Sequence, residues 1–137
     1  MARTRIPHAE GMAAVRACID RPEGLPGQPA QPGQPAQPGR PDPVTERTAV
    51  KYALQALTDR APGYSVEVRI PPFAAAQAVA GPTHRRGTPS AVVEMDADTW
   101  LALATGQVTW DSARAAGRIR ASGQRADLSP WLPLLRA

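Results

Sequence analysis

Proline placement limits how much of this 137-residue chain can fold. Eight of the 16 prolines lie between Pro22 and Pro43, in a segment that contains the triplet repeat GQPAQPGQPAQPGRP. A collagen triple helix needs glycine at every third position, and Ala30 and Ala36 occupy two of those positions. We therefore interpret residues 22–43 as a Pro/Gln/Gly-rich disordered linker, with docking to a proline-recognition domain as the alternative. The linker separates an N-terminal helical segment, residues 1–21, from a folded domain over residues 44–137.

Two helices are predicted on either side of the linker. Apolar residues at spacings of three and four indicate a short helix over residues 9–20. Asp42 and Pro43 predict the start of a longer helix, because aspartate caps a helix and proline suits its first position. Pro62 and Gly63 end that helix.

Three strands are then expected before the next helix. Residues 64–70, YSVEVRI, alternate so that Tyr64 would share one face with the apolar residues Val66, Val68 and Ile70. Residues 73–81 are rich in alanine, but their place between a strand and a Gly-Pro turn favours a second strand, hairpinned to the first. Residues 91–95, AVVEM, predict the third strand.

The last third of the chain alternates capping residues and glycines. Asp96 and Thr109 are expected to cap two short helices, which Gly106 and Gly117 end. Residues 118–122, RIRAS, predict a fourth strand, and residues 129–135, SPWLPLL, predict a terminal helix that is apolar on every side. Strands come first and helices cluster later, which is typical of an α+β fold built on a mostly antiparallel sheet.

Charge and composition narrow the classes of partner. The formal net charge is +4, and Lys51 is the only lysine, which fits an arginine-biased coding sequence. A basic chain can also contact anionic lipids or nucleic acid. Aromatic residues are only 4% of the chain and do not interleave with basic ones, so we expect no nucleic-acid binding.

No catalytic set stands out in the sequence. Cys18 is the only cysteine, and His8 and His84 are the only histidines, so we predict no metal site, no cofactor and no enzymatic activity. His84, Arg85 and Arg86 would contact an anionic headgroup, with a solvated loop as the alternative. No signal peptide or membrane span is recognisable, so we expect a cytoplasmic protein without stable membrane insertion.

Residues 92–123 resemble the second half of the sterol-carrier-protein lipid-binding domain, in its stand-alone bacterial form. The resemblance rests on a strand, a helix that Asp96 caps and that carries Trp100, a glycine stop at Gly106, a small second helix and a basic-flanked strand between Gly117 and Gly123. It implies a twisted sheet of about five strands, covered on one face by short helices. Only four strands are readable in the sequence.

The resemblance also implies an apolar tunnel that holds a fatty acid, sterol or acyl-CoA-like lipid. We expect its wall to comprise nine side chains: Val66, Val68, Ile70, Phe73, Trp100, Leu103, Trp131, Leu132 and Leu135. The alternative is that these side chains fill a compact core. The chain would then be a lipid-free interaction domain or an accessory to a separate enzyme.

Overall fold

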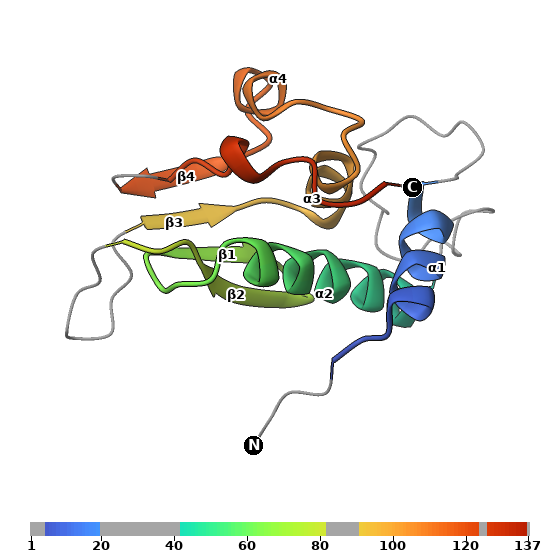
Figure 1. Cartoon of the computed structure of the whole chain (residues 1–137). Coiled ribbons are helices and arrows are strands. Elements are labelled where there is room, and N and C mark those ends of the chain that lie inside the picture. The colour runs from blue at the N-terminus through green and yellow to red at the C-terminus, as the bar shows by residue number, and fades with distance from the viewer. Residues whose placement is uncertain (1–4, 20–41, 82–90, 124–125, 137) are drawn as a thin grey trace.

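The computed structural model describes residues 5–19, 42–81, 91–123 and 126–136 (Figure 1). Most of the proline-rich linker, and His84, Arg85 and Arg86 of the predicted headgroup contact, lie outside these residues. The elements are α1 (His8–Ile19), α2 (Pro43–Arg60), β1 (Val66–Ile70), β2 (Ala74–Ala78), β3 (Ala91–Glu94), α3 (Ala97–Ala104), α4 (Trp110–Ala115), β4 (Arg120–Gly123) and the 3₁₀ turn η1 (Ser129–Trp131).

The three predicted helix caps are confirmed. The side chain of Asp42 accepts a hydrogen bond from the backbone N–H of Thr45 at 2.7 Å, which caps α2. Asp96 caps α3 in the same way, with 2.7 Å to the backbone nitrogen of Thr99. Thr109 caps α4 through Ser112, at 3.1 Å. Each cap satisfies a backbone donor that the first helical turn leaves without a partner.

The sheet is mixed and has four strands over the described residues, in the order β2-β1-β3-β4. The predicted hairpin of β1 and β2 is confirmed, and β4 pairs antiparallel with β3. However, β1 and β3 pair in parallel at the centre. The prediction of about five mostly antiparallel strands is therefore wrong in strand number and in the central pairing. The reason is that alternation indicates which face a residue takes but not which strand lies beside it.

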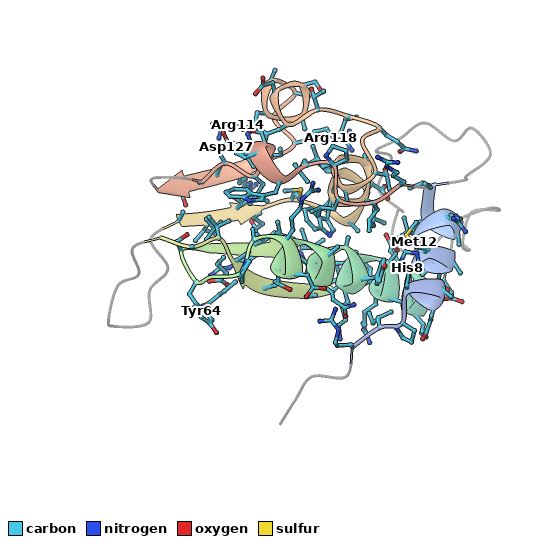
Figure 2. The ribbon with its side chains drawn as sticks, viewed as in Figure 1. His8, Met12, Tyr64, Arg114, Arg118 and Asp127 are labelled. Atoms are coloured by element: carbon cyan, nitrogen blue, oxygen red, sulfur yellow. The ribbon has the colours of Figure 1, made fainter. Side chains whose placement is uncertain are left out.

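One face of the sheet, here called the inner face, carries the apolar core. Val66, Val68 and Ile70 of β1 point to it and are completely buried, and α2 runs along this side (Figure 1). Tyr64 does not join them. Its side chain is 69% exposed, because β1 begins only at Val66 (Figure 2). The predicted inward direction of Tyr64 is therefore wrong.

The predicted terminal helix is also wrong. Residues 126–136, here called the terminal segment, contain only the single turn η1. The backbone N–H groups of Leu134 and Leu135 donate to the carbonyl oxygen of Ala104 at 2.8 and 2.9 Å. Arg60 donates to the carbonyl oxygens of Trp131 and Pro133, at 3.3 and 2.8 Å. Bonds to the ends of α2 and α3 thus replace the intrahelical ones, and Pro133 has no N–H to continue a helix.

Both predicted glycine stops adopt the left-handed conformation, with φ of 79° at Gly106 and 73° at Gly117. A Cβ atom at Gly106 would lie 3.4 Å from Pro133, whereas one at Gly117 would meet nothing within 4 Å. A substitution at Gly117 therefore tests backbone strain alone. Gly117→Val is expected to lower the free energy of unfolding by about 1 kcal/mol or more, measured by urea denaturation. The control is Ala116→Val, at an exposed neighbour with φ of −79°. Equal losses from the two variants would contradict the strain interpretation.

Candidate functional site

The nine side chains predicted to line a ligand site come together in one hydrophobic cluster. Six of them are buried in it: Val66, Val68 and Ile70 from β1, Trp100 and Leu103 from α3, and Leu135 from the terminal segment. The other three, Phe73, Trp131 and Leu132, are partly buried and pack against the cluster. The fold therefore gathers side chains that lie up to 69 positions apart in the sequence, from Val66 to Leu135.

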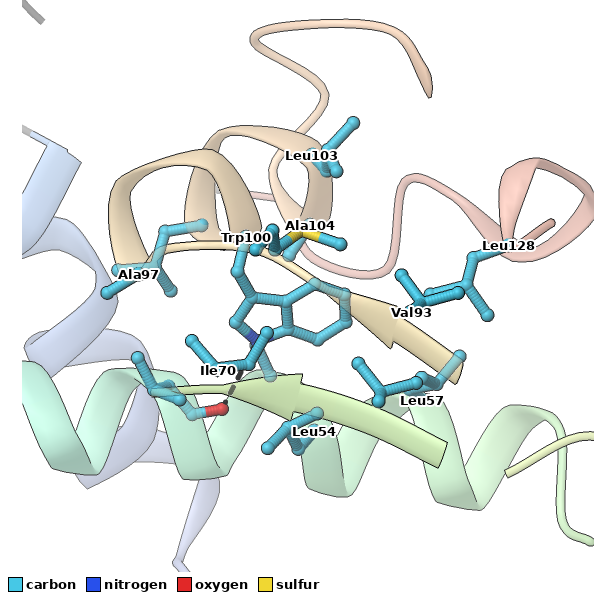
Figure 3. Packing of buried hydrophobic residues seen from close by; sticks show 14 of the residues in the cluster. Leu54, Leu57, Ile70, Val93, Ala97, Trp100, Leu103, Ala104 and Leu128 are labelled. Atoms are coloured by element: carbon cyan, nitrogen blue, oxygen red, sulfur yellow. Dashed lines mark hydrogen bonds between the residues drawn. The ribbon is translucent and has the colours of Figure 1, made fainter. Parts of the chain in front are cut away.

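Trp100 lies at the centre of this cluster (Figure 3). Its indole extends from α3 toward α2 and is completely buried. The indole N–H donates to the backbone carbonyl of Val50 in α2, at 3.3 Å. This bond satisfies the one polar atom of a side chain that would otherwise lose hydrogen bonding on burial. Trp100 thus joins the two helices in both apolar and polar contact.

The core residues missing from the predicted set include Leu54, Leu57, Val93 and Leu128. All are buried in the same cluster, and Figure 3 shows them around Trp100. The helical spacing of Val50, Leu54 and Leu57 does indicate an apolar face in the sequence. It does not indicate that this face meets Trp100, because spacing carries no information on the partner element.

Two surface pockets formed by the described residues have volumes of about 450 Å³ each, and neither of these two is lined by any of the nine predicted residues. In this conformation the nine side chains contact the rest of the core. A ligand among them would require part of the cover to move.

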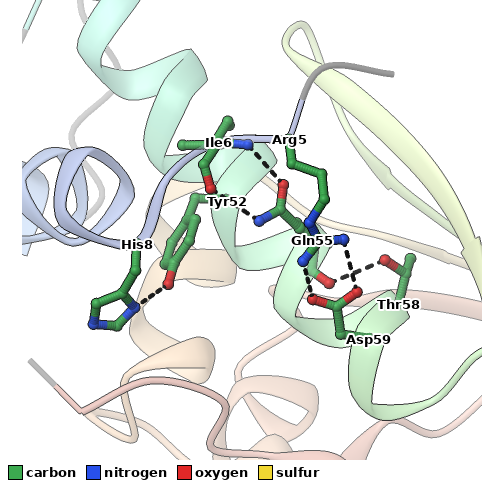
Figure 4. A network of polar contacts seen from close by, with 7 residues as sticks. All are labelled: Arg5, Ile6, His8, Tyr52, Gln55, Thr58 and Asp59. Atoms are coloured by element: carbon green, nitrogen blue, oxygen red, sulfur yellow. Dashed lines mark hydrogen bonds and ion pairs between the residues drawn. The ribbon is translucent and has the colours of Figure 1, made fainter. Parts of the chain in front are cut away.

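The first pocket, here called the N-terminal groove, lies between residues 5–8 and α2 (Figure 4). Its polar groups have partners within the chain. Arg5 makes two hydrogen bonds to the carboxylate of Asp59, at 3.1 and 2.6 Å, and Tyr52 bonds His8. The hydrogen bond from Arg5 is the main reason that the pKa of Asp59 lies below its ordinary value. These contacts therefore hold residues 5–8 against α2.

The second pocket, here called the outer pocket, opens on the opposite face of the sheet, beside α4. Its lining mixes Arg69, Arg114 and Arg120 with residues of β3 and β4. The sequence analysis noticed the arginines that flank β4 but assigned them no role.

The described part of the chain contains neither a cluster of metal ligands nor a helix that could span a membrane. No three His, Cys, Asp or Glu side chains of those residues gather as metal ligands would. Across the same residues, no helix is long and apolar enough to cross a membrane.

Comparison with known protein families agrees with this architecture. A family model described as "Bacterial SCP ortholog", where SCP denotes sterol carrier protein, matches residues 42–134. The matched range begins at the cap of α2, includes the whole sheet with α3 and α4, and leaves out α1. No curated protein matches the chain. Since the match spans more than half of the sequence, this chain belongs to the family of bacterial sterol carrier protein orthologues.

Proposed function

We propose that this protein binds and carries a hydrophobic ligand, such as a fatty acid, a sterol or an acyl-CoA-like lipid, without catalysing a reaction. The observation that carries the proposal is the family match over residues 42–134, which includes the sheet and its helical cover.

The best place is the inner face of the sheet, under the terminal segment. This segment crosses the core while several of its large apolar side chains stay only partly buried, among them Trp131, Leu132 and Leu134. It is held by the main-chain bonds to Ala104 and by those from Arg60, an exposed side chain. Lifting the segment would break few hydrogen bonds, would expose Leu128 and Leu135, and would open the cluster around Trp100.

An acyl chain in this place would replace the contacts of the terminal segment. Burying a methylene group yields about 0.8 kcal/mol. The loss of translational and rotational freedom, and the work of lifting the segment, reduce that gain. A chain of ordinary fatty-acid length is therefore expected to bind with micromolar affinity.

The test is a titration with fluorescent fatty-acid, acyl-CoA and sterol probes. Leu132→Asp places a charge on the partly buried side of the terminal segment, and it is expected to weaken binding at least about tenfold, because an unpaired charge is costly in an apolar site. Val44→Asp is the matched control, since Val44 is 71% exposed at the start of α2. Circular dichroism checks that both variants fold. A wild type that binds none of the three probes saturably would refute the lipid-carrier proposal.

A second candidate is a lipid-free interaction domain. Its support is that neither surface pocket includes any of the nine predicted wall residues. Native mass spectrometry of freshly purified protein, before and after organic extraction, separates the two candidates. Endogenous lipid that extraction removes favours the carrier. A lipid-free protein that copurifies with a stable partner favours the interaction domain.

A further inference from the structure

The outer face of the sheet, opposite the apolar core, carries an ordered row of charge. Strand register places Arg69 of β1 beside Glu94 of β3, and Glu94 beside Arg120 of β4. The next row places Val92 beside Ser122. Side chains on one face of a sheet recur at every second residue, so these five share the outer face.

The outer pocket lies over this part of the sheet and has a volume of about 450 Å³. Val92 gives it apolar surface and Ser122 adds a hydroxyl group, whereas Ile119 and Ala121 line it but pack against the core. Arg114 of α4 lines it as well. The pocket therefore combines apolar surface with the guanidinium groups of Arg69, Arg114 and Arg120.

Positive charge in the outer pocket exceeds the negative charge that could neutralise it. Arg69 is already held by Glu67, at 2.8 Å, and this hydrogen bond raises its pKa. Glu94 is the one carboxylate in the lining, and its oxygen lies 3.9 Å from Arg120, too far for a hydrogen bond. The Arg120 side chain is 88% exposed. Among the described residues, Arg114 forms no ion pair.

In the N-terminal groove, by contrast, polar side chains already form hydrogen bonds within the chain. Arg5 donates two hydrogen bonds to Asp59. The side chain of Gln55 accepts from the N–H of Ile6 at 3.0 Å and donates to its carbonyl at 3.1 Å (Figure 4). Arg114 and Arg120 make no comparable hydrogen bonds within the described chain. Of these two pockets, the outer one therefore has guanidinium donors to offer an outside ligand.

We propose that the outer pocket binds a phosphate monoester attached to a small apolar group. Two guanidinium groups match the double negative charge of a phosphate monoester better than the single charge of a carboxylate, and each guanidinium can bond phosphate oxygens in a fork. The apolar group would lie against Val92. This site is on the opposite face of the sheet from the proposed lipid site and does not depend on it.

The test uses phenyl phosphate as the probe and isothermal titration calorimetry as the readout. Saturable binding at millimolar concentration or below is expected, and inorganic phosphate should bind more weakly because it lacks the apolar group. Arg114→Gln and Arg120→Gln should each weaken phenyl phosphate binding about tenfold or more, the usual effect of losing a charge-assisted hydrogen bond. The matched control, Arg47→Gln, removes the same charge from an exposed position on α2 and should leave binding unchanged.

Vesicles distinguish a free metabolite from a lipid headgroup. Phosphatidic acid carries the same phosphate monoester, so phosphatidylcholine vesicles with and without it are compared by co-sedimentation. Binding of phenyl phosphate alone supports a free ligand, whereas binding to the phosphatidic acid vesicles, lost in Arg120→Gln, supports a headgroup. If wild type binds neither, the proposal is wrong. It is equally wrong if Arg47→Gln reduces binding as much as Arg114→Gln and Arg120→Gln do, because nonspecific charge would then explain the result.

Discussion

Trp100→Ala is expected to lower the free energy of unfolding by about 3–5 kcal/mol, measured by urea denaturation. Trp100 is completely buried, and it contributes both apolar contacts on the inner face and the hydrogen bond to Val50. Its removal would leave a cavity between α2 and α3 that neighbouring side chains could fill only in part. A loss this large is a substantial fraction of the stability of a small domain, so part of the variant is expected to be unfolded at 37 °C.

Two further substitutions show where this loss comes from. Trp100→Phe keeps much of the ring volume but removes the indole N–H and its bond to the Val50 carbonyl, which lies within helix α2, so a loss of about 1 kcal/mol is expected from the hydrogen bond. Trp131→Ala truncates the same residue type at a partly buried position, where the loss should be clearly smaller. If Trp100→Ala and Trp131→Ala cost the same, Trp100 is not the centre of the core.

The second large effect is expected at Gly11 in α1. A Cβ atom built on Gly11 would overlap the ring of Tyr52 in α2. That ring has little room to move, because Tyr52 is buried and its hydroxyl bonds His8 (Figure 4). Gly11→Ala should therefore separate α1 from α2 and lower the free energy of unfolding by about 1–3 kcal/mol, although alanine favours a helix more than glycine does.

A bulkier residue on the exposed side of α1 serves as the control. Ala13→Leu adds more volume than Gly11→Ala, but Ala13 faces solvent, so stability is expected to stay within about 0.5 kcal/mol of wild type. A stabilised Gly11→Ala variant would mean that helix propensity outweighs the contact with Tyr52. The close packing of α1 on α2 would then be wrong.

The Gly11 result matters because α1 lies outside the region that matches the family. The match begins at residue 42, yet Met12, Val15 and Cys18 of α1 are buried in the same core as α2 and α3. Residues 8–19 therefore add a helix to the matched region and contribute to its core. A variant that lacks α1 would expose apolar surface on α2, including Tyr52.

Local features of this protein could be predicted from the sequence alone. Asp42, Asp96 and Thr109 cap helices because their side chains reach a backbone donor within three residues. Gly106 and Gly117 end helices because only glycine enters the left-handed region at little cost. Each of these features depends on neighbouring residues in the chain. For the same reason the apolar face of β1 was predicted correctly from Val66 to Ile70.

Features that depend on distant partners were decided by the tertiary structure. The parallel pairing of β1 with β3 is invisible in the sequence, because alternation is the same for either strand direction. The terminal segment is apolar like a buried helix, but its backbone donates hydrogen bonds to Ala104 and accepts others from Arg60. The candidate lipid site follows the same division. Sequence could select Trp100 and Leu135 as apolar, but only packing places them in one cluster.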